Sequence, residues 1–246
     1  MAIPVLLLND GNNISKIGFG TGIAWYKNDP KGPFNPTLVE VLKYAVSKGF
    51  IHIDCADSYG TEPEVGVAIK ESGAIDESLK RLQLEYVDLY LLHNPFIIPT
   101  AQELQAAWKG LENVKTSRKA RSIGISNLQR NHVETILQAA TITPAINQLE
   151  YHPCLQRAHD YITWLRERGF VVSSFKGLAP ITVGKGGPLD DVVAKAAASH
   201  GVVPSTILLR WSLDQNVVPI TTTTNIDRMD NYLGALQLTL TREEME

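Results

Sequence analysis

The stretch Gly49-Phe-Ile-His-Ile-Asp-Cys-Ala-Asp-Ser-Tyr-Gly-Thr-Glu-Pro-Glu-Val-Gly66 decides the fold. Residues 51–53 read as a short buried strand that ends at Asp54, and a loop carrying Tyr59 leads to a helix opening at Thr61. An acid and a phenol five residues apart at the end of a strand are placed to do proton chemistry together. The stretch therefore predicts a strand–loop–helix unit with reactive side chains at the carboxyl end of its strand.

A second apolar run, residues 86–93, ends in the same way on His93, which Asn94-Pro95 follows. Because the carboxyl ends of barrel strands share one face, we expect Asp54, Tyr59 and His93 to converge there. The alternative for each residue alone is structural: an Asp that caps a helix, a Tyr that packs in a loop, and a core His satisfied by backbone groups.

Length and composition indicate one large domain over residues 1–246. With 44% hydrophobic and 20% charged residues, the chain suits a soluble globule with a sizeable core, and its net charge of −3 favours neither nucleic acid nor membranes as partners. Two cysteines are too few for a disulfide framework, so we expect a cytoplasmic location. We see no signal peptide or membrane-spanning run in the sequence.

Strand-like runs alternate with helical patterns along the chain, which predicts βα units and a parallel sheet behind an N-terminal hairpin over residues 3–8 and 14–17. The expected barrel strands cover residues 16–21, 51–53, 86–92, 120–125, 145–150, 170–175 and 217–221. The expected helices cover residues 37–48, 62–72, 101–115, 129–140, 155–168, 189–200, 204–215 and 227–236.

That count gives seven barrel strands, and the irregularity lies at the junction of Gly73 and Ala74. Gly73 reads as a helix C-cap, and residues 74–82 read as another amphipathic helix with no strand before them. We expect the third barrel strand to be missing there, either because the sequence omits residues that the real protein has or because of a true deletion. The chain also stops at residues 241–246 inside a starting helix, so we expect the domain to be incomplete at the C-terminus.

These features together resemble the aldo-keto reductases, and the phrases Gly18-Phe-Gly-Thr-Gly22, Leu91-Leu-His-Asn-Pro-Phe96 and Phe175-Lys-Gly-Leu-Ala-Pro180 look most like the fungal members. The resemblance implies a (β/α)8 TIM barrel with a hairpin cap. It also implies a monomer that reduces ketones, aldehydes, dicarbonyls or keto esters with NADPH.

In that family an Asp/Tyr/His set acts together with a Lys. The resemblance makes Tyr59 the proton donor, His93 the residue that orients the carbonyl, and Asp54 the partner of the Lys. The strand that would carry this Lys is the one missing at the junction. Without it, Asp54 would raise the pKa of Tyr59 and would itself be an unpaired carboxylate that is costly to bury.

The resemblance also implies cofactor-binding positions along the chain. Ser126, Asn127 and Gln148 would hold the nicotinamide carboxamide, and Phe175 would stack on its ring with Leu178 nearby. The alternative for Ser126 and Asn127 is helix capping, since a predicted helix follows them.

Around the last strand, Thr222-Thr223 replaces the Lys-Ser of many family members, while Arg228 keeps its spacing. Hydroxyls, backbone N–H groups and one Arg can still bind the adenosine 2′-phosphate. We therefore expect NADPH, with NADH as a further cofactor. Thr21 is expected beside the cofactor, and Trp25 and Asn94 in the substrate pocket.

Two other functions stay open. If the Lys strand is truly absent, the chain is a non-catalytic, NADPH-binding barrel that acts as a sensor or partner subunit. A barrel lyase or aldolase is a more distant alternative, against which we count the lack of any lysine at a strand end. The remaining histidines show no metal-ligand spacing, so we expect no metal.

Overall fold

The computed structural model describes residues 3–69, 82–96, 98–156 and 159–245. Its strands are β1 (Val5–Leu7), β2 (Asn13–Ser15), β3 (Gly18–Gly20), β4 (Ile53–Asp54), β5 (Val87–Leu92), β6 (Ala120–Ser126), β7 (Ile146–Glu150), β8 (Val171–Phe175) and β9 (Val218–Thr221). Its α-helices are α1 (Pro36–Ser47), α2 (Glu62–Ile69), α4 (Ala101–Thr116), α5 (Arg130–Leu137), α6 (His159–Glu167), α7 (Asp190–His200), α8 (Pro204–Asp214), α9 (Asp227–Gly234) and α10 (Arg242–Met245). Two short 3₁₀ helices, η1 (Asp57–Tyr59) and η3 (Ala179–Ile181), follow β4 and β8.

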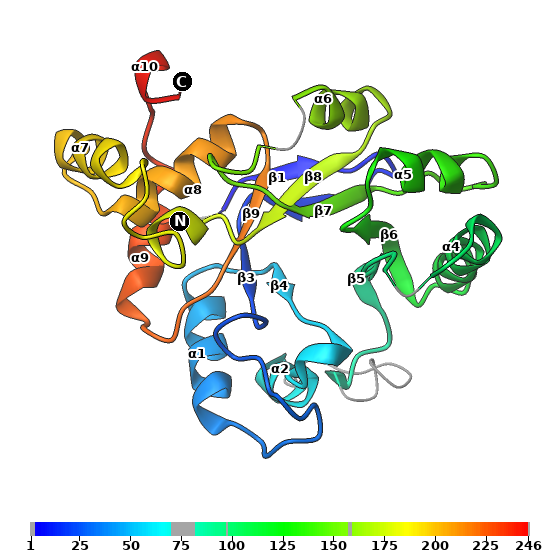
Figure 1. Cartoon of the computed structure of the whole chain (residues 1–246). Helices are drawn as coiled ribbons and strands as arrows, with labels where there is room; N and C mark the ends of the chain where they lie inside the picture. Colours follow the sequence, from blue (N-terminus) through cyan, green and yellow to red (C-terminus); the bar gives the residue numbers. More distant parts are fainter. Residues whose placement is uncertain (1–2, 70–81, 97, 157–158, 246) are drawn as a thin grey trace.

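Strands β3 to β9 form a curled parallel sheet with helices outside it, which confirms the predicted α/β barrel class (Figure 1). The strand order is β4-β3-β9-β8-β7-β6-β5. Strands β4 and β5 follow one another among the described strands, yet they lie at opposite ends of the sheet. No described strand pairs with their outer edges, so the described sheet has seven strands and stays open between them.

The hairpin β1–β2 closes the amino end of the sheet, as the sequence predicts. Its strands pair antiparallel, with Val5 opposite Ser15. Leu8 and Ile14 pack with Ile146 and Val218, the first residues of β7 and β9. The opposite, carboxyl end of the strands is therefore the end left for loops with functional side chains.

Two larger apolar clusters hold the helices on the sheet. The first joins β6–β8 to the helices from α4 to α8 and contains the buried indoles of Trp108, Trp164 and Trp211. The second joins β3 to α1, α2 and α9, with Phe19 and Phe50 packed edge to face at its centre. Burial of each large side chain contributes about 1.5–3 kcal/mol, so these clusters account for much of the driving force of folding.

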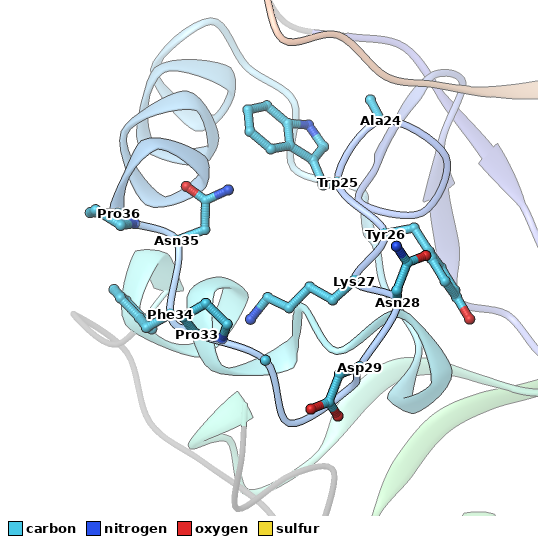
Figure 2. A pocket seen from close by; sticks show the side chains of 11 residues that line it. Ala24, Trp25, Tyr26, Lys27, Asn28, Asp29, Pro33, Phe34, Asn35 and Pro36 are labelled. Carbon is cyan, nitrogen blue, oxygen red and sulfur yellow. The ribbon is translucent and has the colours of Figure 1, made fainter.

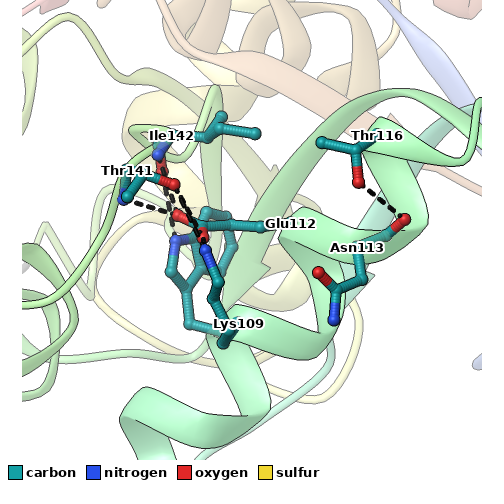
Figure 3. A network of polar contacts seen from close by, with 7 residues as sticks. Lys109, Glu112, Asn113, Thr116, Thr141 and Ile142 are labelled. Atoms are coloured by element: carbon teal, nitrogen blue, oxygen red, sulfur yellow. Dashed lines mark hydrogen bonds and ion pairs between the residues drawn. The ribbon is translucent and has the colours of Figure 1, made fainter.

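A buried carboxylate fastens α4 to the loop before β7 (Figure 3). Glu112 is 1% exposed and accepts hydrogen bonds from the backbone N–H groups of Thr141, at 2.6 Å, and Ile142, at 2.8 Å. Lys109 Nζ lies 2.6 Å from its other oxygen. These donors hold the pKa of Glu112 at about 2, against the opposing effect of burial.

Where the structure describes them, the predicted helices and strands begin and end within a few residues of the observed ones. The buried strand predicted over residues 51–53 is wrong in its position and burial. The strand after Gly49 covers only Ile53–Asp54, and Ile51 is 71% exposed where a buried strand was predicted. Because β4 lies at the edge of the described sheet, a side chain two residues before it has no neighbouring strand to cover it. The Gly73–Ala74 junction and most of the helix expected over 74–82 lie outside the described residues.

Within the described ranges, no single helix is both long and apolar enough to cross a bilayer. Helices α7 and α8 pass that test only when taken together, on length and composition, and they are bent by 94°.

Candidate active site

The three predicted catalytic residues come together at the carboxyl end of the sheet. Asp54 ends β4, Tyr59 ends η1, and His93 directly follows β5. The rings of Tyr59 and His93 meet edge to face, with centroids 5.7 Å apart and planes at 86°. The two edge strands of the described sheet therefore contribute to one site, although they do not pair with each other.

Glycines let the backbone approach the Tyr59 ring closely. A Cβ on Gly22 would lie 3.1 Å from Tyr59 Cε2, so a larger residue would push the phenol aside. Gly60 has φ +68°, a conformation that favours glycine, and a Cβ there would lie 2.7 Å from Pro30 Cα. The backbone N–H of Lys27 donates to the Tyr59 carbonyl oxygen at 3.1 Å. The loop after β3 and the loop after β4 therefore hold Tyr59 between them.

The buried position of Asp54 disfavours the charged form of its carboxyl group. Burial raises its pKa to about 6. One hydrogen bond among the described residues supports its charge, from Gln148 Nε2 at 3.2 Å. Among the described residues no cation lies within ion-pair distance of its carboxylate.

Tyr59 is a weaker acid than a free phenol. Burial raises its pKa first, and the negative charge of Asp54 raises it further. A phenol with a raised pKa stays protonated at every physiological pH, but it releases its proton less readily. The predicted proton donor therefore has, among the described residues, no positive group that lowers its pKa.

His93 is suited to donate a hydrogen bond as a neutral imidazole, because desolvation lowers its pKa. Asn127 Nδ2 donates to the His93 carbonyl oxygen at 3.0 Å and fixes the end of β5 against β6. Asn94 turns the chain after His93, since its side-chain oxygen accepts from the N–H of Phe96 at 3.1 Å. This contact gives Asn94 a turn-forming position next to the site.

The expected carboxamide ligands form a connected group at the ends of β6 and β7. Ser126 Oγ donates to the Gln148 carbonyl oxygen at 2.9 Å, and Asn127 Nδ2 lies 3.1 Å from Ser126 Oγ. Asn127 has φ +63°, which Asn tolerates better than most residues. Gln148 in turn donates to Asp54, and Asn127 donates to the His93 carbonyl oxygen, so the expected cofactor residues are hydrogen-bonded to two of the three predicted catalytic residues.

Phe175 ends β8, opposite Glu150 on β7, and Leu178 packs against both large apolar clusters. Lys176 follows Phe175 directly, with Nζ 5.9 Å from the Phe175 ring centroid and 3.2 Å from Glu150 Oε2. Our premise that no lysine stands at a strand end is therefore wrong. The sequence signal was present, because Lys176 follows an apolar run that was itself predicted as a strand.

The loop after β9 offers hydroxyls for a phosphate. Thr222 Oγ1 is buried without a hydrogen-bond partner among the described residues, while Tyr232 Oη donates to the Thr222 carbonyl oxygen at 3.3 Å. Thr223 Oγ1 accepts from the N–H of Asn225 at 3.0 Å in the turn before α9. Arg228 lies exposed on α9. A partnerless buried hydroxyl and an exposed guanidinium fit an anionic group at this place.

Thr21 is fully buried, and its hydroxyl lies 2.8 Å from Thr61 Oγ1 and 3.1 Å from the Asp54 carbonyl oxygen. Trp25 packs into the apolar cluster beneath α1 and lines a pocket of about 580 Å³ in the loop between β3 and α1 (Figure 2). Residues 24–29 and 32–36 line this pocket. None of the three predicted catalytic residues lines it, so this pocket is separate from the candidate site.

Tyr26 is the functional candidate that the sequence analysis missed. Its ring meets the Tyr59 ring with centroids 6.2 Å apart and planes at 60°. Only the neighbouring Trp25 was singled out, because an exposed Tyr in a loop carries no pattern. The described residues contain no group of His, Cys, Asp and Glu that could hold a metal ion.

Comparison with known proteins shows which proteins the chain is similar to. The model of the Aldo/keto reductase family matches residues 72–246. An NAD/NADP-dependent indole-3-acetaldehyde reductase from Schizosaccharomyces pombe is 33% identical over 98% of this chain and 93% of its own length. An NADPH-dependent alpha-keto amide reductase from Saccharomyces cerevisiae is 32% identical over 97% of this chain and 88% of its own length.

Solved structures give the same result. An aldo/keto reductase from Brucella melitensis has a TM-score of 0.84 at 25% identity, over 99% of this chain and 97% of that one. An aldo-keto reductase from a Medee basin deep-sea metagenome library has a TM-score of 0.85 at 26% identity, over 98% of this chain and 92% of that one. The fold and site define a barrel oxidoreductase of the NAD(P)-dependent class. Within that class, the chain belongs to the aldo/keto reductase family.

The comparisons also bear on the expected missing strand. The alignment with the S. pombe protein runs over 267 residues, although this chain has 246, so at least 21 positions (267 minus 246) have no counterpart here. The family match begins at residue 72, next to the Gly73–Ala74 junction. The alignment length agrees with residues missing from this chain relative to the S. pombe protein.

Proposed function

We propose that the protein reduces ketones and aldehydes to alcohols with NADPH, with Tyr59 as the proton donor. The observation that carries the proposal is the convergence of Asp54, Tyr59 and His93 at the carboxyl ends of β4 and β5, with the Tyr59 and His93 rings 5.7 Å apart. The names of the relatives, which include an indole-3-acetaldehyde reductase and an alpha-keto amide reductase, support aldehydes and activated ketones as substrates.

Each residue of the site has a separate task in this proposal. His93 donates a hydrogen bond to the substrate carbonyl oxygen, which orients it and stabilises the charge that develops there. Tyr59 Oη transfers its proton to the same oxygen. Asp54 sets the acidity of Tyr59 through its charge, and Gln148 holds the Asp54 carboxylate in place.

The nicotinamide cofactor, when bound, supplies the hydride. Amide and hydroxyl groups of Ser126, Asn127 and Gln148 match the donor and acceptor groups of a carboxamide, and Phe175 offers an aromatic face to the ring, with Leu178 and Thr21 beside it. Thr222, Thr223 and Arg228 offer hydroxyls and one positive charge to the 2′-phosphate. The positive charge of Arg228 supports NADPH as the preferred cofactor. Because Thr222 and Thr223 carry no charge, we propose NADH as a second cofactor.

The test is cofactor binding and turnover by the purified protein. We expect NADPH to bind and to be oxidised in the presence of an activated aldehyde. We also expect Tyr59→Phe to lower kcat by on the order of 10²–10⁴-fold without loss of NADPH binding. Tyr90→Phe, at an exposed tyrosine on β5, is the matched control and should leave kcat unchanged. Protein that neither binds NADPH nor reduces any activated carbonyl would overturn the proposal.

The electrostatics of the site favour a second candidate, a barrel that binds NADPH without turnover. Tyr59 has a raised pKa and Asp54 lacks a described cation, so acid catalysis is weak in the described site. Under this alternative, NADPH binds with ordinary affinity, and wild type and Tyr59→Phe show the same negligible rate. A rate that falls on substitution of Tyr59 excludes it.

We further propose that the protein works as a monomer in the cytoplasm, on small carbonyl compounds. Two free cysteines, Cys55 and Cys154, support a reducing compartment. Size-exclusion chromatography with light scattering checks the monomer, for which we expect the mass of one 27.1 kDa chain.

A further inference from the structure

Tyr59 is the middle member of a row of three rings. Tyr26 meets it on one side, at 6.2 Å between centroids, and His93 meets it on the other, at 5.7 Å. Both contacts are edge to face, the arrangement that aromatic pairs prefer. The role proposed for Tyr59 uses its hydroxyl and that for His93 its imidazole, but the proposed reaction gives Tyr26 no task.

Tyr26 is held in place, yet half of it is open to solvent. It is 52% exposed, while the residues on either side are anchored: Trp25 is 9% exposed and Lys27 forms a 2.7 Å ion pair with buried Glu64. Glu64 also accepts from the Asn35 N–H at 2.6 Å, which fastens the far end of the same loop. A fixed loop thus presents an aromatic face beside the proton donor, without using it in the core.

Other apolar side chains are exposed on the two loops that flank Tyr59. Ile23, on the Tyr26 loop, is 67% exposed. Phe96, three residues after His93, is 78% exposed, and Asn94 shapes the turn that carries it. Single exposed apolar residues need no explanation, but Tyr26 also touches the reacting residue itself.

The loop supplies a natural control. Phe34 is 49% exposed, almost as much as Tyr26, and lies on the same loop. Figure 2 shows Phe34 across the loop pocket from Tyr26, whose ring is directed away from Phe34. The two aromatic residues therefore match in exposure and in chain segment, and they differ in that only Tyr26 contacts Tyr59.

We infer that Tyr26 determines substrate specificity: it selects carbonyl compounds with an aromatic group next to the carbonyl carbon over small aliphatic ones. The inference rests on the proposed function, because it places the carbonyl oxygen at Tyr59 and His93. The aromatic group of such a substrate covers the exposed face of Tyr26, removing apolar surface of both rings from water. Aromatic contacts of this kind correspond to roughly 2- to 12-fold in affinity, beyond what small aliphatic groups gain.

The test compares phenylglyoxal with methylglyoxal, which share the dicarbonyl group and differ by phenyl against methyl. We expect wild type to have the higher kcat/KM with phenylglyoxal. Tyr26→Ala should lower the phenyl-to-methyl ratio of kcat/KM by roughly 2- to 12-fold, mainly through KM. Tyr26→Phe and Phe34→Ala should both keep the wild-type ratio. A ratio unchanged in Tyr26→Ala, or lowered equally in Phe34→Ala, overturns the inference.

A binding measurement separates this inference from the proposed function. If wild type shows no turnover, the proposed function fails, and acetophenone binding in the presence of NADPH, followed by saturation-transfer NMR, still tests Tyr26. Loss of the acetophenone signal in Tyr26→Ala but not in Phe34→Ala supports the aromatic contact. Equal signals in all three proteins, or none in wild type, overturn it.

Discussion

Replacement of Asp54 by Asn should stabilise the protein at neutral and alkaline pH. The pKa of this carboxyl rises from its ordinary 3.8 to about 6 because burial disfavours the charge. At 1.36 kcal/mol for each pKa unit, keeping Asp54 ionised in the folded state costs roughly 3 kcal/mol. Asn keeps the shape and can still pair with Gln148, so we expect Asp54→Asn to be more stable by about 1–3 kcal/mol at pH 8.

The sign of the pH dependence follows from the raised pKa. The folded protein holds the Asp54 proton more tightly than the unfolded chain does. The stabilising contribution of that proton is therefore fully present below pH 3.8 and is lost as the pH rises through about 6. The advantage of Asp54→Asn should shrink to near zero at pH 4. Urea unfolding at pH 4, 6 and 8 measures this, with Asp88→Asn, at an exposed aspartate on β5, as a control that should show no such change.

The same substitution has an expected effect on activity. Because the charge of Asp54 raises the pKa of Tyr59, its removal makes the phenol a stronger acid. We expect the kcat of Asp54→Asn at pH 7 to equal or exceed that of wild type. Wild-type kcat should rise below pH 6, because Asp54 becomes neutral there, and this rise should be absent in the variant. A variant that is less stable at pH 8 and at least tenfold slower would refute the reasoning, because it would mean that a cation pairs with Asp54.

Two further predictions concern stability. Glu112→Gln should cost about 1–3 kcal/mol in urea unfolding at pH 7, because an amide loses the charge that Lys109 and two backbone N–H groups support. Since the folded pKa of Glu112 is lowered to about 2, this contribution is complete above pH 4.5 and fades as the pH falls toward 2; an unchanged difference between pH 7 and pH 2.5 would contradict it. Lys176→Gly should raise the free energy of unfolding by about 1 kcal/mol, because the φ of +54° at this position suits glycine better than lysine. A thermal midpoint of the variant below that of wild type would show that the lost contact with Glu150 outweighs the relieved backbone strain.

Local sequence patterns predicted where several candidate residues lie, because strand ends are local features. An apolar run and the polar residue at its end place Asp54 and His93 at the carboxyl ends of their strands. Phe175 is itself the last residue of such a run. The Gly22 contact with Tyr59 could not be found in this way, since it depends on how closely two loops approach each other.

What the sequence by itself determined is the order of strands and helices, the family, and the residue types at the mouth of the barrel. Periodicity and strand-end motifs are written along the chain, so they need no knowledge of distant neighbours. Only the tertiary structure decided that β4 and β5 lie at opposite ends of the described sheet, and that the Tyr26 ring contacts the Tyr59 ring edge to face. It also decided that the Asp54 carboxyl is buried, which raises its pKa. Burial and charge at one atom depend on segments far apart in sequence, and these come together only when the chain folds.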